Sequence, residues 1–482
     1  MGELPKSSSA APKSASDPNS GSNTSHALQM LLTDIAARAA RYIQASEQRH
    51  VAPLDGDVER LESLGGPLPQ TPSSPADVIS LLDEFGSPAT IASTGGRYFG
   101  FVTGGALPAA LAADWMASAW DQNAYHSPLI EKIEQITFTW MCQIFGLPES
   151  CAAGFVTGTT MATFTGLAAA RHALLQRAGW NVEEDGLFNA PPITVVIGSE
   201  VHASLLKALS LLGLGRKRVK VVPTDNQGRM RADALPVLND RTIVCIQSGN
   251  VNTGSFDPAA EICARAREAN AWVHVDGAFG LWAAAVPSRA HLVEGIGAAD
   301  SWAVDCHKWL NVPYDSGVIF VREPEHLHAA MTVGAPYLKT ADGHMPPLYT
   351  PENSRRARAV AAWAALRSLG RNGLAELIER NCQLAKRFAE GIRAAGYTVL
   401  NDVVLNQVLV AFGDAATTRR VISALQEDGT AWFGGTQWQG HTAMRISVSS
   451  WKTTEEDVDR ALAAILRVAQ AESSQEAALG QR

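Results

Sequence analysis

The sequence is poor in the residues that mark disulfide frameworks and metal centres. Its 482 residues include only six cysteines, which are Cys142, Cys151, Cys245, Cys263, Cys306 and Cys382. They form no CxxC pair and match no metal-ligand spacing. We therefore expect scattered thiols in a reducing compartment and no metal site.

Long apolar runs and an excess of positive charge are also absent. No stretch reaches the roughly twenty apolar residues that a membrane helix needs, and residues 1–25 lack the apolar core of a signal peptide. Lys and Arg total 40 against 48 Asp and Glu, which gives a formal net charge of −8. Nucleic-acid binding needs clustered positive charge. We therefore expect a cytoplasmic protein with no membrane partner and no nucleic-acid partner.

The composition that is present is typical of a globular protein, with 46% hydrophobic and 18% charged residues. From about 96 to 325, short apolar runs rich in β-branched residues alternate with helical stretches. The runs lie at 193–198, 218–222, 242–247, 271–275 and 318–321. This alternation predicts an α/β fold with a mostly parallel central sheet and helices on both faces.

The predicted organisation has five parts. Residues 1–25 and 471–482 are expected to be flexible tails because they are rich in small and polar residues. Residues 26–95 carry helical periodicity. Residues 96–354 are expected to form the large domain, and 355–470 a smaller C-terminal α+β domain with strands near 407–412 and 443–449.

The most informative segment is DCHKWLN at 305–311, about thirty residues after HVDGA at 274–278. A desolvated lysine loses some preference for its ammonium form, so the Lys308 amine is suited to add to an aldehyde. Asp276 follows a run typical of a buried parallel strand, and active-site groups gather at the carboxyl ends of such strands. Its carboxylate suits the protonated ring nitrogen of pyridoxal phosphate. The alternative for Lys308 is an ordinary surface lysine, and the alternative for Asp276 is a helix N-cap at the end of the strand.

These motifs, together with DSG at 315–317, resemble those of the group II pyridoxal phosphate-dependent decarboxylases. That family includes glutamate, aromatic amino acid and histidine decarboxylases, and the resemblance runs from about 97 to 451. It implies a fold-type I enzyme in which Lys308 attaches pyridoxal 5'-phosphate, Asp276 pairs with the pyridinium and Ala278 packs on one ring face. It also implies a homodimer with composite sites.

The segment GFVTGTT at 154–160 predicts a strand, a glycine turn and a helix N-terminus, which together suit a phosphate. The resemblance implies that Thr159, Thr160 and His307 contact the cofactor phosphate. Asp305 is expected among the cofactor-binding residues as well. The alternative for the glycine segment is an ordinary turn.

Two further segments follow the order of the family. In SEVHAS at 199–204, the resemblance implies that His202 stacks on the open face of the cofactor ring, with a purely structural histidine as the alternative. In the loop at 249–257, Val251 takes the position of a cofactor-facing threonine in relatives. Asn250 and Asn252 are the candidate replacements.

Substrate contacts are expected from three residues that match positions in relatives. Phe101 and Thr103 match pocket residues, and Arg445 matches an arginine that holds the substrate α-carboxylate. A guanidinium suits a carboxylate geometrically. The alternatives are core packing for Phe101 and an acid at a domain interface as the partner of Arg445. Phe101 and Trp438 together favour an aromatic or apolar substrate.

The predicted reaction is decarboxylation of an L-amino acid to the amine and carbon dioxide. In relatives a tyrosine on a mobile loop supplies the proton to Cα, but this chain has Pro346 at that position. Tyr349 is the nearest candidate in the sequence, and Tyr337, His344 and His202 are the next candidates. The departure leaves aldehyde-forming decarboxylation, retro-aldol cleavage and transamination as alternatives, and a cofactor-binding protein without turnover as a third class.

Overall fold

The computed structural model describes residues 20–124, 127–332 and 346–480. The chain divides into two compact units. One comprises the residues up to Arg49 together with Pro53–Ile91, and the other comprises His50–Ala52 and Ala92–Arg482. Within the described ranges, no helix has both the length and the apolar character needed to cross a membrane.

The first unit is helical. It contains α1 (Ser20–Ala45), α2 (Asp55–Glu59), the 3-10 turn η1 (Arg60–Leu64) and α3 (Pro75–Gly86). Helix α3 begins where the Ser74 hydroxyl accepts the Asp77 N–H at 3.1 Å. Arg38 of α1 ties the two long helices together through Asp83 of α3 at 2.9 Å.

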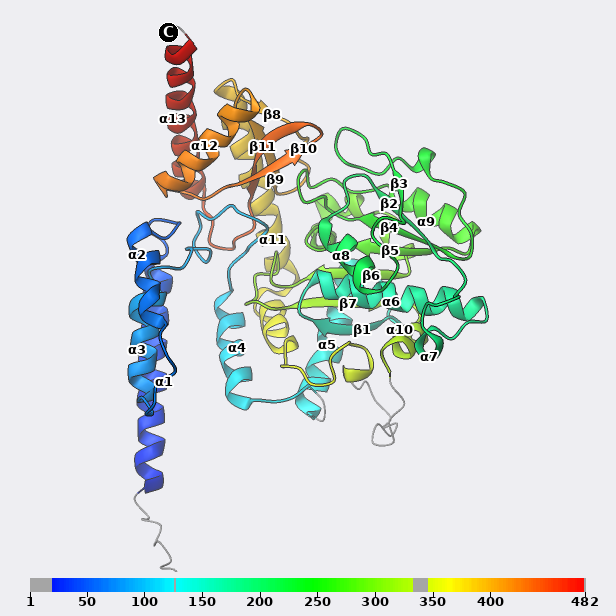
Figure 1. Ribbon diagram of the computed structural model, residues 1–482, viewed down its shortest axis with the longest axis horizontal. Coiled ribbons are helices and arrows are strands. Elements are labelled where there is room, and N and C mark those ends of the chain that lie inside the picture. Colours follow the sequence, from blue (N-terminus) through cyan, green and yellow to red (C-terminus); the bar gives the residue numbers. More distant parts are fainter. Residues whose placement is uncertain (1–19, 125–126, 333–345, 481–482) are drawn as a thin grey trace, which may run out of the picture. The chain divides into compact units, whose positions relative to one another are not determined.

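The second unit contains a seven-stranded sheet in the order β1-β7-β6-β5-β4-β2-β3 (Figure 1). Its strands are β1 (Ala152–Val156), β2 (Thr194–Gly198), β3 (Lys220–Val222), β4 (Thr242–Gln247), β5 (Trp272–Asp276), β6 (Ser301–Asp305) and β7 (Gly317–Val321). The pairs from β6 through β5, β4 and β2 to β3 are parallel, while β7 runs antiparallel to both β6 and β1. The predicted mostly parallel sheet is confirmed.

Alternate residues of the buried strands pack into two separate cores, one on each face of the sheet. Because both faces are buried, β4 has almost no polar residue. Ile243 and Cys245 of β4 face the core that includes α6 (Thr159–Arg177), α8 (Ala203–Leu211) and α10 (Pro324–Met331). Val244 and Ile246 face the opposite core. That core includes α5 (Pro128–Phe145), α9 (Ala259–Glu268) and the first part of α11 (Ala359–Ala394) (Figure 1). Helices therefore cover both faces.

Shorter elements complete this region. They are α4 (Pro108–Trp120), α7 (Val182–Asp185), and the 3-10 turns η2 (Ala232–Ala234), η3 (Gly280–Ala285), η4 (Pro287–Val293), η5 (Ile296–Ala298) and η6 (Pro346–Leu348).

Strand β6 was not among the predicted runs. Its sequence SWAVD is short and half polar, and it becomes a central strand only because β5 and β7 pair with it.

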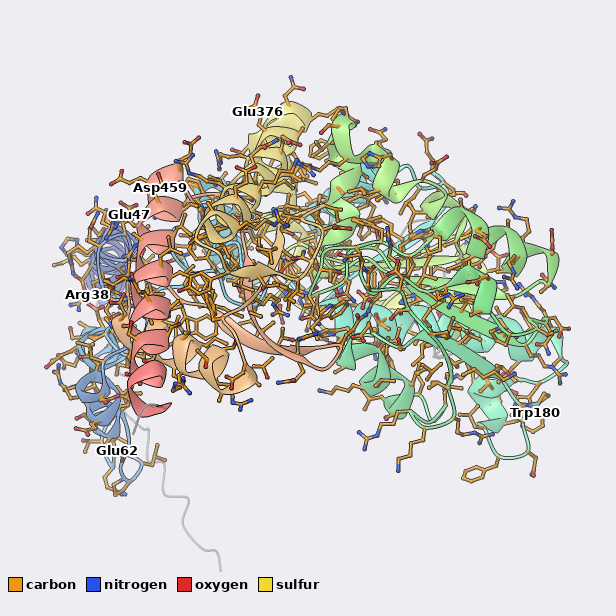
Figure 2. All side chains as sticks on the ribbon, turned by 90° about the horizontal axis from the view of Figure 1, so that it is seen from above. Arg38, Glu47, Glu62, Trp180, Glu376 and Asp459 are labelled. Carbon is orange, nitrogen blue, oxygen red and sulfur yellow. The ribbon has the colours of Figure 1, made fainter. Side chains whose placement is uncertain are left out.

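A second, antiparallel sheet of four strands has the order β10-β11-β9-β8. Its strands are β8 (Thr398–Val399), β9 (Gln407–Ala411), β10 (Gly434–Trp438) and β11 (His441–Ser447), and it packs with α12 (Ala415–Asp428), α13 (Glu455–Gly480) and the end of α11. On the outside, Asp459 of α13 pairs with Arg387 of α11 at 2.7 Å (Figure 2).

The segment around Phe99 packs with the four-stranded region. Phe99, expected in the large domain, is fully buried in the core of the four-stranded region. Its N–H bonds to the Trp432 carbonyl and its carbonyl accepts the Ser447 N–H, both at 2.9 Å. Helix α11 spans both cores and bends at Gly370, where φ is 60°.

Candidate active site

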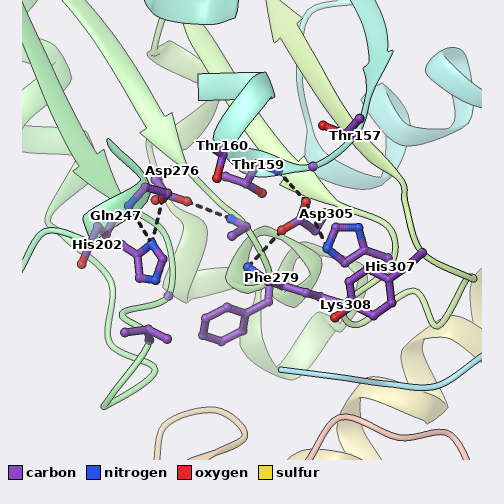
Figure 3. A pocket seen from close by; sticks show the side chains of 16 residues that line it. Thr157, Thr159, Thr160, His202, Gln247, Asp276, Phe279, Asp305, His307 and Lys308 are labelled. Atoms are coloured by element: carbon purple, nitrogen blue, oxygen red, sulfur yellow. Dashed lines mark hydrogen bonds and ion pairs between the residues drawn. The ribbon is translucent and has the colours of Figure 1, made fainter. Parts of the chain in front are cut away.

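The carboxyl ends of three adjacent strands meet at one cavity of about 370 Å³. Gln247 ends β4, Asp276 ends β5 and Asp305 ends β6, and the side chains of all three line the cavity (Figure 3). The start of α6 and the segment before α8 supply the remaining walls. In an open α/β sheet this edge is where ligands bind.

Lys308 lies in this cavity, three residues beyond β6. Its Nζ is 2.9 Å from Asp305 Oδ2, and its side chain is 25% exposed against 3% for Asp305. The other oxygen of Asp305 accepts the Thr159 N–H at 2.6 Å. Lys308 is therefore held at the rim of the cavity by a buried carboxylate that also caps α6 (Figure 3).

Desolvation was expected to reduce the preference of Lys308 for its ammonium form, and the ion pair with Asp305 acts against that effect. Burial does lower the pKa of Lys308. The charge and hydrogen bond of Asp305 outweigh that effect and hold the pKa above its usual value. The same pairing holds the pKa of Asp305 below its usual value, against the effect of burial. The apolar sequence context around Lys308 did not show that the fold brings the Asp305 carboxylate near its amine.

Asp276 is 6% exposed and lies beside His202 and Gln247 in the cavity (Figure 3). One of its oxygens accepts the Ala278 N–H at 3.2 Å. Burial raises the pKa of Asp276, while the charges of His202 and Lys308 act in the opposite direction. A buried carboxylate of this kind is stabilised by a cation placed against it. The protonated ring nitrogen of pyridoxal phosphate is such a cation.

His202 is the N-cap residue of α8, and its Nδ1 accepts the Ser204 N–H at 3.2 Å. Because Nδ1 accepts, the proton of the neutral ring is on Nε2. Burial of the ring in the cavity wall lowers the pKa of His202, although Asp276 acts against that shift. A neutral, oriented imidazole beside Asp276 suits contact with a flat aromatic ring.

The residues at the start of α6 fit a phosphate group. The Thr159 hydroxyl is buried and has no hydrogen-bond partner among the described residues. A Cβ at Gly158 would lie 3.0 Å from His307 Cε1, so glycine keeps this space open. The first turn of a helix leaves N–H groups without intrahelical partners, and the helix dipole favours an anion there. Thr160 and His307 line the same part of the cavity.

Tyr314 is a cavity residue that the sequence analysis did not identify. Its ring stacks on His307 with centroids 4.3 Å apart and an interplanar angle of 30°. It is 60% exposed and lines the same cavity as Lys308. Gln247 and Ser204 were missed as well. The available signals were the position of Tyr314 six residues after Lys308 and that of Gln247 at the end of a predicted strand.

Asn252 does not line the cavity. Its side-chain Oδ1 accepts a hydrogen bond from the Thr436 hydroxyl at 3.0 Å, and its backbone N–H donates to Asn250 Oδ1 at 2.9 Å. Val251 lines the cavity in its place. Contact of Asn252 with the cofactor stays a prediction, and its described hydrogen bonds are made within this loop and to β10.

Tyr349 and Trp438 also lie away from Lys308. Tyr349 lines a separate cavity with Phe138 and Cys142, on the side of α5 and β1. Trp438 is 2% exposed and packs on Leu409. Tyr337 and His344 lie outside the described residues. In this chain the described phenol that lines the cavity is therefore Tyr314.

The three expected substrate residues lie near the site but outside the cavity lining. Phe101 is 62% exposed and stacks on Trp432 at 5.9 Å. Thr103 is 9% exposed, and the adjacent Gly104 packs against the Lys308 carbonyl.

Arg445 pairs with Gly434 in the small sheet and is half-buried. No ion pair or hydrogen bond of its side chain occurs within the described part of the chain. Burial lowers the pKa of Arg445. Its charge also acts to lower the pKa of Tyr98 and of His202.

Comparison with known proteins assigns this site to a class. Residues 91–413 match the model of the pyridoxal-dependent decarboxylase conserved domain. The chain belongs to the pyridoxal-dependent decarboxylase family, and it is a pyridoxal phosphate-dependent carboxy-lyase.

Individual relatives agree with this class. The chain is 25% identical over 432 residues to an aromatic-L-amino-acid decarboxylase of Bacillus atrophaeus, covering 84% of this chain and 87% of that protein. It is 28% identical to 4-hydroxyphenylacetaldehyde synthase of Rhodiola rosea, covering 71% and 74%. The fold is similar to the crystal structure of Oryza sativa TDC with PLP and tryptamine, at a TM-score of 0.85 and 22% identity, covering 95% and 99%.

Proposed function

We propose that this enzyme converts an aromatic or apolar L-amino acid to its amine and carbon dioxide. The observation that carries the proposal is the cavity in which Lys308, Asp276, His202 and the start of α6 come together. Bound pyridoxal phosphate supplies an electron-withdrawing ring that stabilises negative charge developing at the substrate Cα.

Different residues of the cavity bind different parts of pyridoxal phosphate. Lys308 is the covalent attachment point, and Asp276 pairs with the ring nitrogen because a buried carboxylate favours a cationic partner. Thr159, Thr160 and His307 hold the phosphate, with the buried Thr159 hydroxyl as donor. His202 and Ala278 enclose the ring. Asp305 holds Lys308.

Arg445 and the aromatic residues next to it support an aromatic substrate. Tyr98 and Phe101 both stack on Trp432, with centroids 5.1 Å and 5.9 Å away. Arg445 is a guanidinium without a carboxylate partner among the described residues, and the substrate α-carboxylate fits it. The relative from Bacillus atrophaeus, an aromatic-L-amino-acid decarboxylase, supports the same substrate class.

Tyr314 is the group we assign to proton delivery. After carbon dioxide leaves, the substrate Cα needs one proton to become the amine. A phenol stays protonated near neutral pH and is a suitable general acid. Tyr314 lines the Lys308 cavity, whereas Tyr349 lines another.

A second candidate function is aldehyde formation. Pro346 stands where relatives have the proton-donating tyrosine, and one relative is a 4-hydroxyphenylacetaldehyde synthase. Aldehyde formation is a two-electron oxidation, so it consumes dioxygen and water and releases carbon dioxide, ammonia and hydrogen peroxide. The identity of the product therefore separates the two functions.

The experiment is a substrate panel with product identification. Purified enzyme is incubated with tryptophan, tyrosine, phenylalanine, leucine, glutamate and 2,4-diaminobutyrate, and the products are identified by mass spectrometry. We expect amines from the aromatic or apolar members. Turnover of glutamate or 2,4-diaminobutyrate alone would contradict the proposed substrate class, and aldehyde from the aromatic members would support the second function.

Lys308→Ala is the matched control for this experiment. Borohydride reduction of the wild-type enzyme should leave pyridoxal phosphate on the peptide that contains Lys308. The variant should carry none. A reduced adduct on another lysine in the variant would show that the attachment point is wrong.

A further inference from the structure

Asp305 connects two parts of the site. One carboxylate oxygen accepts the Thr159 N–H at 2.6 Å at the start of α6, and the other lies 2.9 Å from Lys308 Nζ. Since the same side chain makes both contacts, the position of the lysine depends on the position of the helix start.

The Asp305 backbone is anchored as firmly as its side chain. Its N–H donates to the Ala278 carbonyl at 2.9 Å, and its carbonyl accepts the Trp282 indole N–H at 3.0 Å. Asp305 also pairs with Gly317 across β6 and β7. Only 3% of the Asp305 side chain is exposed, so the carboxylate is held in place on both its backbone and its side chain.

Titratable groups from several elements surround Lys308. They are Asp305 and His307 on its own segment, Asp276 at the end of β5, His202 before α8 and Tyr314 on the following loop. The ion pair with Nζ in the described chain is made by Asp305. Asp305 is therefore the group whose removal changes the surroundings of Nζ most directly.

We propose that Asp305 is a positioning residue for Lys308: its carboxylate aims Nζ into the cavity, favours the protonated amine and couples both to the start of α6. This inference rests on the proposed attachment of pyridoxal phosphate at Lys308. By this proposal, Asp305 determines the pH at which the Lys308 amine loses its proton and becomes a free nucleophile. Lys308 must lose a proton before its nitrogen can form a bond to an aldehyde carbon.

The test is Asp305→Asn in the full chain freed of bound cofactor. The carboxamide oxygen still accepts the Thr159 N–H, so the substitution removes the charge and keeps the helix cap. Lys308 is labelled with trace acetic anhydride at a series of pH values and quantified by mass spectrometry against Lys452. We expect the pH of half-maximal labelling of Lys308 to fall relative to wild type.

Asp315→Asn is the matched control, because Asp315 is a nearby aspartate that pairs with Arg358 at 2.8 Å and does not line the cavity. It should label as wild type does. Asp305→Ser, a smaller neutral acceptor, is measured alongside in case the first variant does not fold. A half-labelling pH equal to wild type in whichever Asp305 variant folds would overturn the proposal.

A second readout uses the enzyme loaded with pyridoxal phosphate. The pH midpoint of its visible absorbance should also move to lower pH in the Asp305 variants and stay in place in Asp315→Asn. Neither readout uses a substrate. A failed substrate panel would therefore leave the labelling result intact, and an unchanged labelling profile would leave the substrate class intact.

Discussion

Single residues in this site act through neighbours about 3 Å away. The pKa of Lys308 stays above its usual value because Asp305 Oδ2 lies 2.9 Å from Nζ, and His202 is oriented because the Ser204 N–H reaches its Nδ1. Coulomb attraction at such distances is large where water is excluded. The consequences of substitution are therefore specific to each residue.

Asp276→Asn tests the electrostatic role of the β5 carboxylate. The substitution keeps the shape and removes the charge, so pyridoxal phosphate should still attach at Lys308. We expect kcat to fall about a hundredfold or more while KM changes little, because the charge acts on the reacting state. An unchanged kcat would remove Asp276 from the reaction.

Tyr314→Phe tests the proposed proton donor. The ring still stacks on His307, but the acidic proton is gone. Loss of a general acid costs about a hundredfold or more, so amine formation should slow by that factor and a larger share of product should be aldehyde. Product ratios are measured by mass spectrometry.

Tyr349→Phe is the matched comparison for that variant, since it removes an equal hydroxyl from a different cavity. We expect it to behave as wild type. The reverse result, with Tyr349→Phe defective and Tyr314→Phe normal, would assign the proton to Tyr349 instead.

At the scale of elements, β5, β6 and α6 are joined behind the site by a buried polar cluster. Ser301 of β6 bonds to His274 Nδ1 at 2.8 Å and accepts the Trp272 indole N–H at 2.9 Å, while Thr163 of α6 lies 3.4 Å from His274 Nε2. Burial lowers the pKa of His274 to about 3. The ring is therefore neutral in the folded protein.

This cluster predicts a pH dependence of stability. An unfolded histidine takes up a proton below about pH 6.5, whereas folded His274 does so only near pH 3. The unfolded state binds more protons between these values, so stability present above pH 6.5 is lost as pH falls. His274→Asn should reduce the slope of the free energy of unfolding between pH 6 and 5 by about 1 kcal/mol per pH unit.

Urea unfolding at pH 7, 6 and 5 measures this slope. His441→Asn is the control, because His441 is exposed on β11 and makes no contact with this cluster. If both variants kept the wild-type slope, His274 would not be the group that links unfolding to proton uptake.

At the scale of the whole molecule, exposed apolar residues support a homodimer. On α4, Trp115, Met116 and Trp120 are 41%, 53% and 38% exposed. In the first unit, Leu28 and Met30 of α1 are 56% and 61% exposed. Clusters of exposed apolar side chains mark interaction sites, and a second copy of the chain is the partner we propose.

Met116→Glu tests this assembly. A charge on the apolar face of α4 should weaken self-association, so sedimentation should show a dimer for wild type and a larger share of monomer for the variant. Phe188→Glu is the control, because Phe188 is an isolated apolar residue that is 89% exposed. A wild-type monomer at assay concentration would contradict the proposed assembly.

Part of this protein follows from its sequence alone. Strand β4 is rich in β-branched residues and was predicted with its full bounds, and β2, β3, β5 and β7 were predicted to within about two residues, whereas β6 was missed. Lys308 and Asp276 were predicted because short motifs carry their chemistry, and the class of enzyme follows from those motifs.

Only the tertiary structure decided which groups meet. The sequence did not show that Asp305 reaches both Thr159 and Lys308, because those contacts depend on the register of β6 beside β5 and β7. The sequence also did not show that Tyr314, and not Tyr349, lines the Lys308 cavity, because distance along the chain does not determine distance in the folded protein. Side-chain contacts of about 3 Å depend on how segments far apart in the sequence pack together, and local sequence patterns do not determine that packing.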